Sequence, residues 1–427
     1  MRYFVLTSLL IIIVGLFIVC GGETKPPETE IIDGVTYIHN ENPDWGDSPK
    51  VSLKFIQKIG ELDHEDNNYL LHKPTDIALD AEGNIYVLDS GNTRIQKYTT
   101  DGKYLQTVGK KGDGPGELRM PHSVDVDNEM NIYISDMNKA KVFSPEGREE
   151  RSIPFGGFLT PFKILSSGDF LSGGGTSGGF ASMGSGATMA FSAVSAMPSG
   201  GNIVFSGTGS DVSISIGEPE SEEDEKIEPK LVKIFDSSGK LKNSFGESLD
   251  YNDNMMNSMG NSIYTAFDQE NNVFISFQHQ NRIEKYSPDG RLLWKADRPL
   301  NYEITGPIEE KTMEISESSG DMMISLKMPK INNVSRGIGV DDLKNVWVMT
   351  YTKQQEQYDP ENPEKERDTK LHIEIEIYDN NGTLLGKLPW EEEFEPTTNC
   401  FHMFGDRLFF ISTDGVSVYE YKIIYSQ

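Results

Sequence analysis

The stretch that decides the fold is PTDIALDAEGNIYVLDSGNTRIQKYTTDGKYLQTVG, residues 74–109, followed by a glycine-rich segment that ends at Pro121. Three groups of turn-forming residues divide it, at Glu82–Asn84, Ser90–Asn92 and Asp101–Gly102. Glycine and asparagine tolerate the positive φ that a tight chain reversal needs. Between the turns, apolar residues alternate with a period of two, which indicates strands rather than helices. The stretch therefore predicts four short antiparallel strands.

The same pattern recurs along the chain. An asparagine followed by three apolar or aromatic residues marks a second strand, and an alternating strand that ends in an aromatic residue and a turn marks an outer hairpin. Second strands are expected at Asn84–Val87, Asn131–Ile134, Asn202–Phe205, Asn272–Ile275 and Asn345–Val348, with a weaker copy at Arg407–Phe410. Outer hairpins are expected at Arg94–Gly102, Lys141–Gly147, Leu231–Gly239, Arg282–Gly290 and Ile373–Gly382. A repeated unit of four antiparallel strands is a propeller blade, so we predict an all-β, six-bladed β-propeller.

The last blade lacks a fourth strand of its own. Val51–Ile59 precedes the first blade and belongs to no other, so we expect it to close the ring as the outer strand of the last blade. The expected propeller spans 51–427, with blades at about 72–110, 120–156, 160–246, 259–300, 335–390 and 396–427 plus 51–60. Phe162–Ser172 resembles a first hairpin without an outer hairpin behind it, and a Gly/Ser/Ala/Met-rich insert, 173–190, follows. We interpret this as an elaborated third blade; seven blades are the alternative.

The long interruptions of the repeat share one face of the predicted ring. In an antiparallel blade, the connections from strand two to strand three and from strand four to the next blade leave on the same face. Residues 207–229, which contain the acidic run Glu218–Glu228, and residues 301–334 and 351–370 all occupy such connections. Insertions are tolerated on loops, where binding surfaces are built. We therefore predict that this face is the working surface.

Residues 1–20 predict an export signal, because Arg2 precedes an apolar run that ends at Val19 and Cys20. Cys20 resembles the acylated cysteine of bacterial lipoproteins, although the three residues before it depart from that pattern. The run could also remain as an uncleaved anchor, or be cleaved to release the protein. Residues 21–50 are polar and contain proline, as a tether would. We expect an exported protein of the bacterial cell envelope, periplasmic or on the outer surface, held to the membrane by its N-terminal anchor alone.

The chain has 427 residues and a net charge of −28, with 67 acidic and 39 basic side chains. This surplus of acid argues against binding to nucleic acid, whose phosphates require cationic side chains. Two cysteines are present, Cys20 and Cys400, so a lipidated Cys20 would leave Cys400 without a disulfide partner. Packed sheets must therefore supply the stability.

Two phrases of the chain resemble the NHL-repeat propellers. They are Asn-Ile-Tyr-Val-Leu-Asp-Ser-Gly-Asn-Thr-Arg-Ile-Gln-Lys-Tyr at 84–98 and Gly-Lys-Lys-Gly-Asp-Gly-Pro-Gly-Glu-Leu at 109–118. The likeness is close over about residues 72–135 and recognisable at 272–292. The arrangement also resembles six-bladed propeller lipoproteins of bacterial envelopes. This resemblance implies a fold and a compartment but no reaction, since propellers support both binding and catalysis.

Relatives of this fold, such as the lyase that completes peptide amidation, hold zinc through histidines at the central channel. That resemblance makes His72, His122 and His402 candidate ligands of a divalent metal, although no cofactor is required by the sequence. Ligand contact at the channel mouth is expected from five residues that lie near strand ends on the working face. They are Asp89, Arg94, His122, Asp136 and His279. For Asp89, Arg94 and Asp136 the competing interpretation is structural, namely capping of strands and contacts between neighbouring blades.

No nucleophile elbow, phosphate loop, metalloprotease helix or paired-cysteine site occurs in the sequence, so catalytic residues are not assigned. The leading hypothesis is a membrane-tethered, non-catalytic propeller that binds a protein, peptide or glycan through the loop-rich face. The alternative is a metal-dependent lyase, lactonase or hydrolase with its site at the mouth of the central channel.

Overall fold

The structure is a computed structural model, and it describes the chain in eleven segments. They are 26–155, 162–173, 203–206, 213–216, 230–252, 254–304, 313–318, 321–326, 331–354, 368 and 370–426. The expected signal 1–20 with its Cys20 lies outside the described residues, as do residues 174–190 and the acidic run Glu218–Glu228. Among the described residues, no helix is long and apolar enough to cross a membrane.

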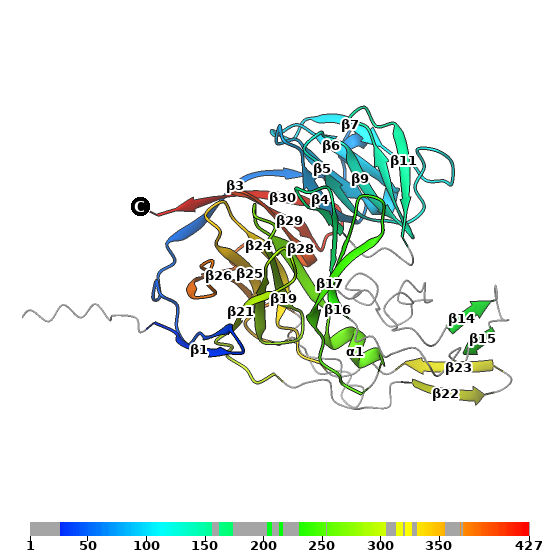
Figure 1. Ribbon diagram of the computed structural model, residues 1–427. Coiled ribbons are helices and arrows are strands. Elements are labelled where there is room, and N and C mark those ends of the chain that lie inside the picture. The colour runs from blue at the N-terminus through cyan, green and yellow to red at the C-terminus, as the bar shows by residue number, and fades with distance from the viewer. Residues whose placement is uncertain are drawn as a thin grey trace, which may run out of the picture.

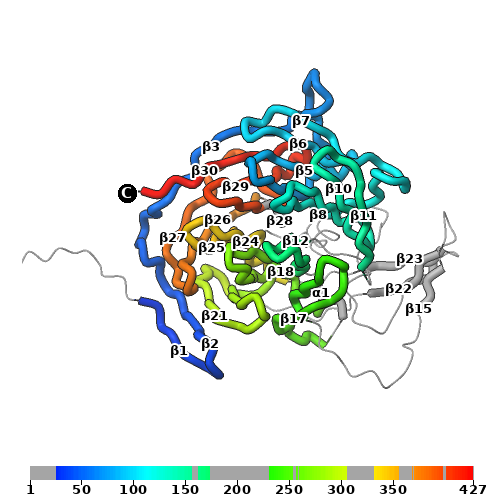
Figure 2. The backbone as a smooth tube through the Cα atoms, turned by 45° about the horizontal axis from the view of Figure 1, so that its top comes forward, coloured from blue at the N-terminus to red at the C-terminus, as the bar shows by residue number. Residues whose placement is uncertain are grey.

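Six sheets form a ring of blades (Figures 1 and 2). Blade one contains β4 (Pro74–Leu79), β5 (Ile85–Asp89), β6 (Arg94–Tyr98) and β7 (Tyr104–Val108), and blade two contains β8 (Pro121–Val126), β9 (Ile132–Asp136), β10 (Lys139–Phe143) and β11 (Glu149–Pro154). Blade three contains β12 (Phe162–Ile164), β13 (Phe170–Gly173), β16 (Lys230–Phe235) and β17 (Leu241–Glu247), and blade four contains β18 (Ile263–Phe267), β19 (Val273–Phe277), β20 (Arg282–Tyr286) and β21 (Leu292–Asp297). Blade five contains β24 (Ser335–Val340), β25 (Val346–Tyr351), β26 (Ile373–Tyr378) and β27 (Leu384–Pro389). Blade six contains β28 (Pro396–Phe404), β29 (Arg407–Ser412), β30 (Val418–Tyr425) and β3 (Val51–Ile59).

This architecture confirms the predicted all-β, six-bladed propeller and rules out the seven-bladed alternative. The predicted ring closure is also confirmed, because β3 pairs antiparallel with β30 from Val51 opposite Tyr425 to Ile59 opposite Val418. The first and last parts of the propeller thus pair within one sheet, blade six. Because β3 also leads into blade one, this pairing holds blades six and one together.

The turns between first and second strands explain why the repeat folds locally. In blade one, Asp80 Oδ1 accepts the backbone N–H of Glu82 at 3.0 Å and of Asn84 at 2.9 Å. Its Oδ2 accepts the Asn84 side-chain amide at 2.9 Å and the Tyr86 hydroxyl at 3.0 Å. One carboxylate therefore satisfies four donors of a reversing chain. The same arrangement occurs at Asp127, Asp268 and Asp341.

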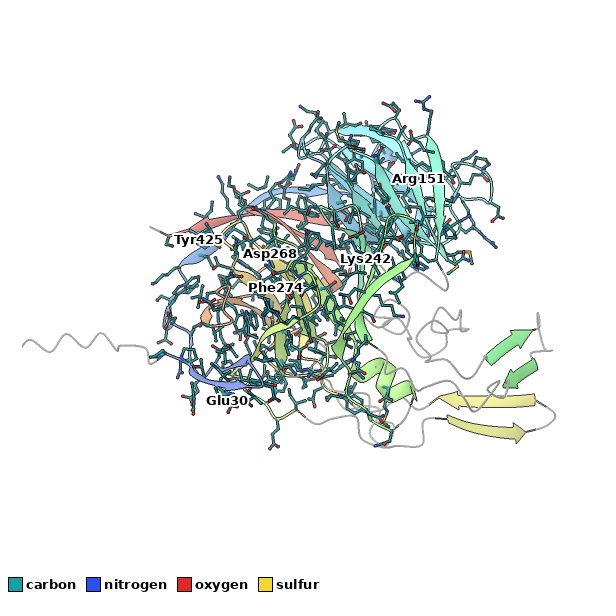
Figure 3. All side chains as sticks on the ribbon, viewed as in Figure 1. Glu30, Arg151, Lys242, Asp268, Phe274 and Tyr425 are labelled. Carbon is teal, nitrogen blue, oxygen red and sulfur yellow. The ribbon has the colours of Figure 1, made fainter. Side chains whose placement is uncertain are left out.

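The core lies between neighbouring blades, where side chains of facing sheets interdigitate. The aromatic residue of each second strand is buried there: Tyr86 (0% exposed), Tyr133 (8%), Phe274 (0%) and Trp347 (0%). Phe274 and its equivalents thus serve inter-blade packing; Figure 3 shows Phe274 among densely packed side chains. Burial of such rings contributes most of the driving force for the fold.

The two faces of the ring differ in their connections. We call the face that carries the connections from strand two to three and between blades the loop face, and the opposite face the turn face. The loop face carries the long β13–β16, β21–β24 and β25–β26 connections and the short helix α1 (Asn254–Gly260) between β17 and β18. Two separate hairpins occur within these connections: β14 (Ile203–Ser206) with β15 (Ser213–Ile216), and β22 (Met313–Ser318) with β23 (Asp321–Leu326).

Blade three corrects one sequence-based assignment. The second strand expected at Asn202–Phe205 does not belong to the blade, because β14, within the part of the chain that the structure describes, pairs with β15 alone in a two-stranded sheet. The second strand is instead β13, which pairs with β12 on one side and β16 on the other. Phe162–Ser172 is therefore the inner hairpin of blade three, and its outer hairpin follows a long connection.

The expected tether at 21–50 is also corrected. β1 (Glu28–Ile32) and β2 (Val35–His39) form a hairpin that extends blade four to six strands, since β2 pairs parallel with β21. We call residues 26–45 the strap. Beyond β2, Asn40 accepts the N–H of Leu384 at 2.8 Å, and the Trp45 N–H donates to the Leu385 carbonyl at 2.7 Å. The strap thus continues along β27 of blade five before it enters β3.

Candidate functional site

Four ionisable side chains from the innermost strands of blades six, one, two and three lie together around the central channel. We call them the channel cluster: His402 from β28, Asp76 from β4, Asp125 from β8 and Lys163 from β12. Asp76 Oδ1 lies 3.3 Å from His402 Nδ1 and 3.4 Å from Lys163 Nζ. The nearby Asp125 carboxylate raises the pKa of Lys163 together with Asp76.

Both carboxylates of the channel cluster also bind the backbone of the next blade. Asp76 Oδ2 accepts the N–H of Val124 at 2.9 Å, and Asp125 Oδ2 accepts the N–H of Ile164 at 2.6 Å. Each contact crosses from one innermost strand to the next around the ring. Burial raises the pKa of Asp125, against the opposing effect of the Lys163 charge and of the Ile164 and Val126 N–H donors. The two aspartates therefore have a structural role, whatever else they do.

His402 and Lys163 are the two members of the channel cluster that can carry a positive charge. His402 is 8% exposed, and burial lowers the pKa of its imidazole to about 4 although Asp76 opposes the change. The ring is therefore neutral near pH 7, and when Nδ1–H donates to Asp76, Nε2 carries a lone pair. His402 Nε2 has no hydrogen-bond partner among the described residues. The Lys163 side chain is 28% exposed, so the cluster also reaches open space.

The predicted ligand residues Asp89 and Arg94 contact each other and the protein backbone. Asp89 Oδ1 accepts the N–H of His72 at 2.7 Å, and its Oδ2 accepts Arg94 Nε at 2.8 Å. Arg94 also donates to the carbonyls of Asn67 at 3.2 Å and Leu70 at 3.0 Å. Asp89 is 0% exposed, and the contacts correspond to the structural interpretation, in which the pair ties the entry of blade one to its second strand.

Asp136 repeats this arrangement in blade two. Its Oδ1 accepts the N–H groups of Arg119 at 3.0 Å and Met120 at 2.7 Å, just before β8 begins. His122 is the second residue of β8, where burial lowers its pKa and the Asp136 charge opposes the change. His122 and Asp136 therefore lie close enough for the charge of one to act on the other.

His279 and His72 lie apart from the channel cluster. Burial lowers the pKa of His279, whose Nδ1 lies 2.8 Å from the carbonyl oxygen of Asn332 in the β21–β24 connection. His72 is exposed, and its ring lies beside Gly91, where an added Cβ would come within 2.1 Å of it. Each histidine is thus engaged with the backbone of its own blade or an adjacent connection.

The three histidines proposed as metal ligands do not converge. Across the described residues, no group of three or more His, Cys, Asp or Glu side chains is placed to hold a metal ion. His402 is instead directed at Asp76, while His72 lies at the surface. The geometry therefore does not support the zinc site that His72, His122 and His402 suggested.

Sequence reasoning missed three of the four residues of the channel cluster. Asp125 and Lys163 each stand between apolar residues of an innermost strand, in Val-Asp-Val and Phe-Lys-Ile, and Asp76 precedes the apolar Ile77 in Thr-Asp-Ile. A charge at such a position must find a partner when the strand is buried, and this signal could have identified them.

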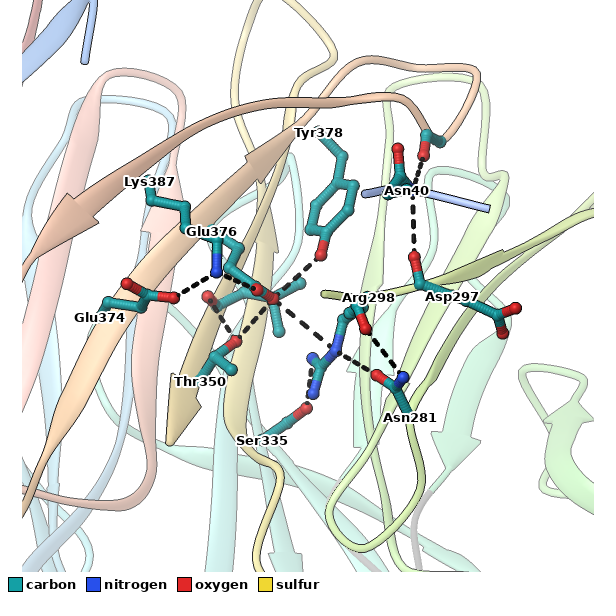
Figure 4. A network of polar contacts seen from close by, with 12 residues as sticks. Asn40, Asn281, Asp297, Arg298, Ser335, Thr350, Glu374, Glu376, Tyr378 and Lys387 are labelled. Carbon is teal, nitrogen blue, oxygen red and sulfur yellow. Dashed lines mark hydrogen bonds and ion pairs between the residues drawn. The ribbon is translucent and has the colours of Figure 1, made fainter. Parts of the chain in front are cut away.

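A second buried network, between blades four and five, was also missed (Figure 4). The Arg298 and Glu376 side chains are both 0% exposed, and Arg298 Nε lies 3.6 Å from Glu376 Oε2. The same oxygen accepts the hydroxyls of Tyr378 and Thr350, each at 2.9 Å. Lys387 lies 3.3 Å from the other oxygen, and burial lowers its pKa less than Glu376 and Glu374 raise it. This network, between sheets, serves to join the two blades.

Comparisons with known proteins agree with this fold. Residues 62–146 match the sequence model of a family described as "6-bladed beta-propeller". The NHL repeat-containing protein 3 of Homo sapiens is 28% identical over 72 residues, 16% of this chain and 21% of that protein, so the match spans about a fifth of the human relative. The chain is thus a six-bladed β-propeller with an NHL-type segment, which confirms the resemblance found in its sequence.

Similar solved structures are more distant. A member of the DUF4221 family from Bacteroides vulgatus has 10% identity and a TM-score of 0.49, covering 88% of this chain and 99% of that one. A gluconolactonase from Xanthomonas campestris has 13% identity and a TM-score of 0.43, covering 94% and 96%. Virginiamycin B lyase from Staphylococcus aureus has 10% identity and a TM-score of 0.39, covering 88% and 100%. At these values the similarities do not bear on the function of this chain.

Proposed function

We propose that the chain is an envelope-tethered, non-catalytic propeller that binds a protein, peptide or glycan partner through its loop face. The supporting observation is the one-sided distribution of its long connections. The β13–β16, β21–β24 and β25–β26 connections all leave from the loop face. Loops on a rigid scaffold are where binding surfaces are usually built, because insertions there do not disturb the core.

The turn face offers a contrast that supports the same proposal. Its reversals are short, and carboxylates such as Asp80 and Asp341 accept the N–H groups of their own turns. The polar groups of such turns bind each other within the fold, so few of them remain to form hydrogen bonds with a partner. The rigid Asp89–Arg94 pair and the Asp136 contacts fix the strand ends from which the loop face begins.

Replacement of part of a loop tests this proposal. Residues 355–367, in the β25–β26 connection, would be replaced by a short Gly-Ser linker, and binding would be measured on peptide and glycan arrays. We expect the unaltered chain to bind a defined class of probe and the replacement to lose that binding without a change in melting temperature. An Asp101→Asn variant on the turn face is the matched control and should bind normally. Binding that survives the loop replacement but is lost in the control would contradict the proposal.

One observation favours a second function, an enzyme of the lyase, lactonase or hydrolase kind with its site at the central channel. Asp76 lies beside the His402 imidazole, and the buried Nε2 would accept a proton or a hydrogen bond from a substrate once a movement of the surrounding side chains uncovers it. A panel of lactones and esters tests this function, with His402→Ala as the comparison. Turnover that disappears in His402→Ala would support the enzyme; absence of turnover across the panel favours the binding function. Elemental analysis of the purified protein for bound divalent metal checks the metal-dependent form separately.

A further inference from the structure

The strap fixes the place at which the described chain begins. His39 of β2 lies opposite Asp297 of β21, and Glu28 of β1 lies opposite His39. Because β21 leads into the β21–β24 connection, Asp297 lies at the loop face, and so does Glu28. The hairpin lies at the outer rim of the ring beside blade four (Figure 2), so the N-terminal segment leaves from the rim at the loop face.

The strap is docked through specific contacts and does not merely lie against the surface. Asn40 is 6% exposed, and its side-chain amide donates to the carbonyls of Asp297 at 3.1 Å and Gly382 at 3.0 Å. Asn40 therefore connects blade four and blade five through hydrogen bonds to both. The Trp45 ring covers Gly386 so closely that an added Cβ would lie 2.2 Å from it.

Docking of the strap shortens the free part of the N-terminal segment. If residues 21–50 were all free, a flexible chain of about 30 residues could extend up to ~100 Å and permit any orientation. With the strap docked, the stretch from Cys20 to Glu28 can span at most about 29 Å. The N-terminal end of β1, from which this stretch departs, lies at the loop face. The short length of the stretch and the place from which it departs thus both favour a membrane on the loop-face side of the ring.

We propose that the strap orients the propeller with its loop face toward the membrane that holds the N-terminus. This inference rests on the N-terminal anchor of the proposed function and deepens it, because the partner must then be a molecule at the membrane surface. The net charge of −28 gives the propeller no general attraction to anionic lipid. The orientation therefore comes from the strap and the short tether, rather than from electrostatic adhesion.

Two labels at opposite ends of β26 test the orientation. Lys370 lies on the loop-face side and Asn381 in the turn at the other end, and both are exposed. The strand between them is ~20 Å long. A bio-orthogonal fluorescent residue would be placed at one position or the other in the full chain. Energy transfer to acceptor-labelled headgroups would be measured in phosphatidylethanolamine–phosphatidylglycerol vesicles, and we expect more transfer from position 370.

A strap-release variant shows whether the strap is the cause. Asn40→Ala combined with Trp45→Ala should abolish the difference between the labels while vesicle flotation is unchanged, and Glu41→Gln is the matched control. If the chain floats with the vesicles but energy transfer from position 370 is equal to or lower than that from position 381, the proposed orientation is wrong while the membrane anchor stands. A difference that persists after strap release, with circular dichroism unchanged, shows that the strap does not orient the ring. An unaltered chain that does not float overturns both the anchor and the orientation. The label comparison in the unaltered strap remains decisive if the double variant fails to fold.

Discussion

The two buried charge networks differ in how completely their surroundings enclose them. Between blades four and five, the Arg298 and Glu376 side chains are 0% exposed, and Tyr378 and Thr350 both donate to one oxygen of the carboxylate. In the channel cluster, Lys163 is 28% exposed and His402 keeps an unbonded ring nitrogen among the described residues. The Arg298–Glu376 pair is thus more completely buried than the His402–Asp76 pair, whose side chains are 7% and 8% exposed. The comparison also predicts that the effect of a substitution on stability follows the burial of the charge.

The largest effect is expected from Glu376→Ala. This change leaves Arg298 buried without its carboxylate, and breaking a buried pair in this way costs roughly 3–5 kcal/mol. Urea unfolding measures the loss of the free energy of unfolding. The double variant Arg298→Met/Glu376→Leu removes both charges and should recover much of the loss. A double variant as unstable as Glu376→Ala would show that packing, rather than the unpaired charge, is responsible.

The channel cluster should make the free energy of unfolding depend on pH. The folded pKa of His402 is about 4, below its ordinary value of 6.5, because burial disfavours the cation. Stability is therefore fully present above pH 6.5 and falls as the pH drops toward 4, where the unfolded chain takes up the proton first. The loss amounts to about 3.5 kcal/mol at most, from the 1.4 kcal/mol that each pKa unit represents. Urea unfolding at several pH values measures it.

His402→Gln provides the control for that titration, because an amide cannot take up a proton in this range. The variant should show a shallower loss of stability between pH 6.5 and 4. Some loss should remain, since burial also lowers the pKa of His122 and His279. An unchanged pH profile would place the acid sensitivity in residues other than His402.

The sequence predicted the fold well because the signals are local. Each turn carries its own carboxylate and asparagine, as Asp80 and Asn84 do, so a blade can be recognised without knowledge of its neighbours. Two features depended on distant pairing and were misread. The β13 and β16 strands are joined across a long connection, and β2 attaches to the edge of β21, more than 250 residues away.

The candidate site was predicted less well for the same physical reason. Asp89, Arg94 and Asp136 were prominent in the sequence because they recur, and they recur because each blade needs its backbone groups satisfied. His402 and Asp76 meet only because the ring closes and brings blade six against blade one. A contact between residues so far apart leaves no short-range pattern, and it becomes visible only when the blades are assembled.

The buried turn carboxylate of Asp80 should give an intermediate effect, because most of the donors that it satisfies are neutral groups. Asp80→Ala removes the acceptor of the Glu82, Asn84 and Tyr86 donors, and a buried donor left without a partner costs roughly 1–3 kcal/mol. Thermal unfolding measures the change, with Asp101→Ala at an exposed turn as the control. A loss equal to that of Glu376→Ala would show that these mainly neutral donors cost as much as the unpaired Arg298 cation.

The smallest effect is expected at His39, which ties the strap to blade four at the surface. Its Nδ1 lies 2.7 Å from Asp297 and its Nε2 lies 3.3 Å from Glu30, and the hydrogen bond to Asp297 is the main cause of its raised pKa. A ring that donates to two carboxylates must carry both protons, so this tie is present below pH 6.5 and is lost as the pH rises through the folded pKa. Because the side chain is 39% exposed, the contribution is a few tenths to about 1 kcal/mol.

Hydrogen exchange of the β2 amides measures this tie without unfolding the ring. Exchange of Val35–His39, corrected for its intrinsic pH dependence, should accelerate as the pH rises above the folded pKa of His39, while β21 stays protected because it also pairs with β20. His39→Gln should remove the pH dependence and leave the Asn40 contacts in place. If the β2 amides in the variant follow the same pH profile as in the unaltered chain, the strap is held by Asn40 and Trp45 alone. In that case the exposed charges of His39, Asp297 and Glu30 contribute nothing measurable to the docking of the strap. The effect of a substitution on stability would then fall to zero for charges as exposed as these.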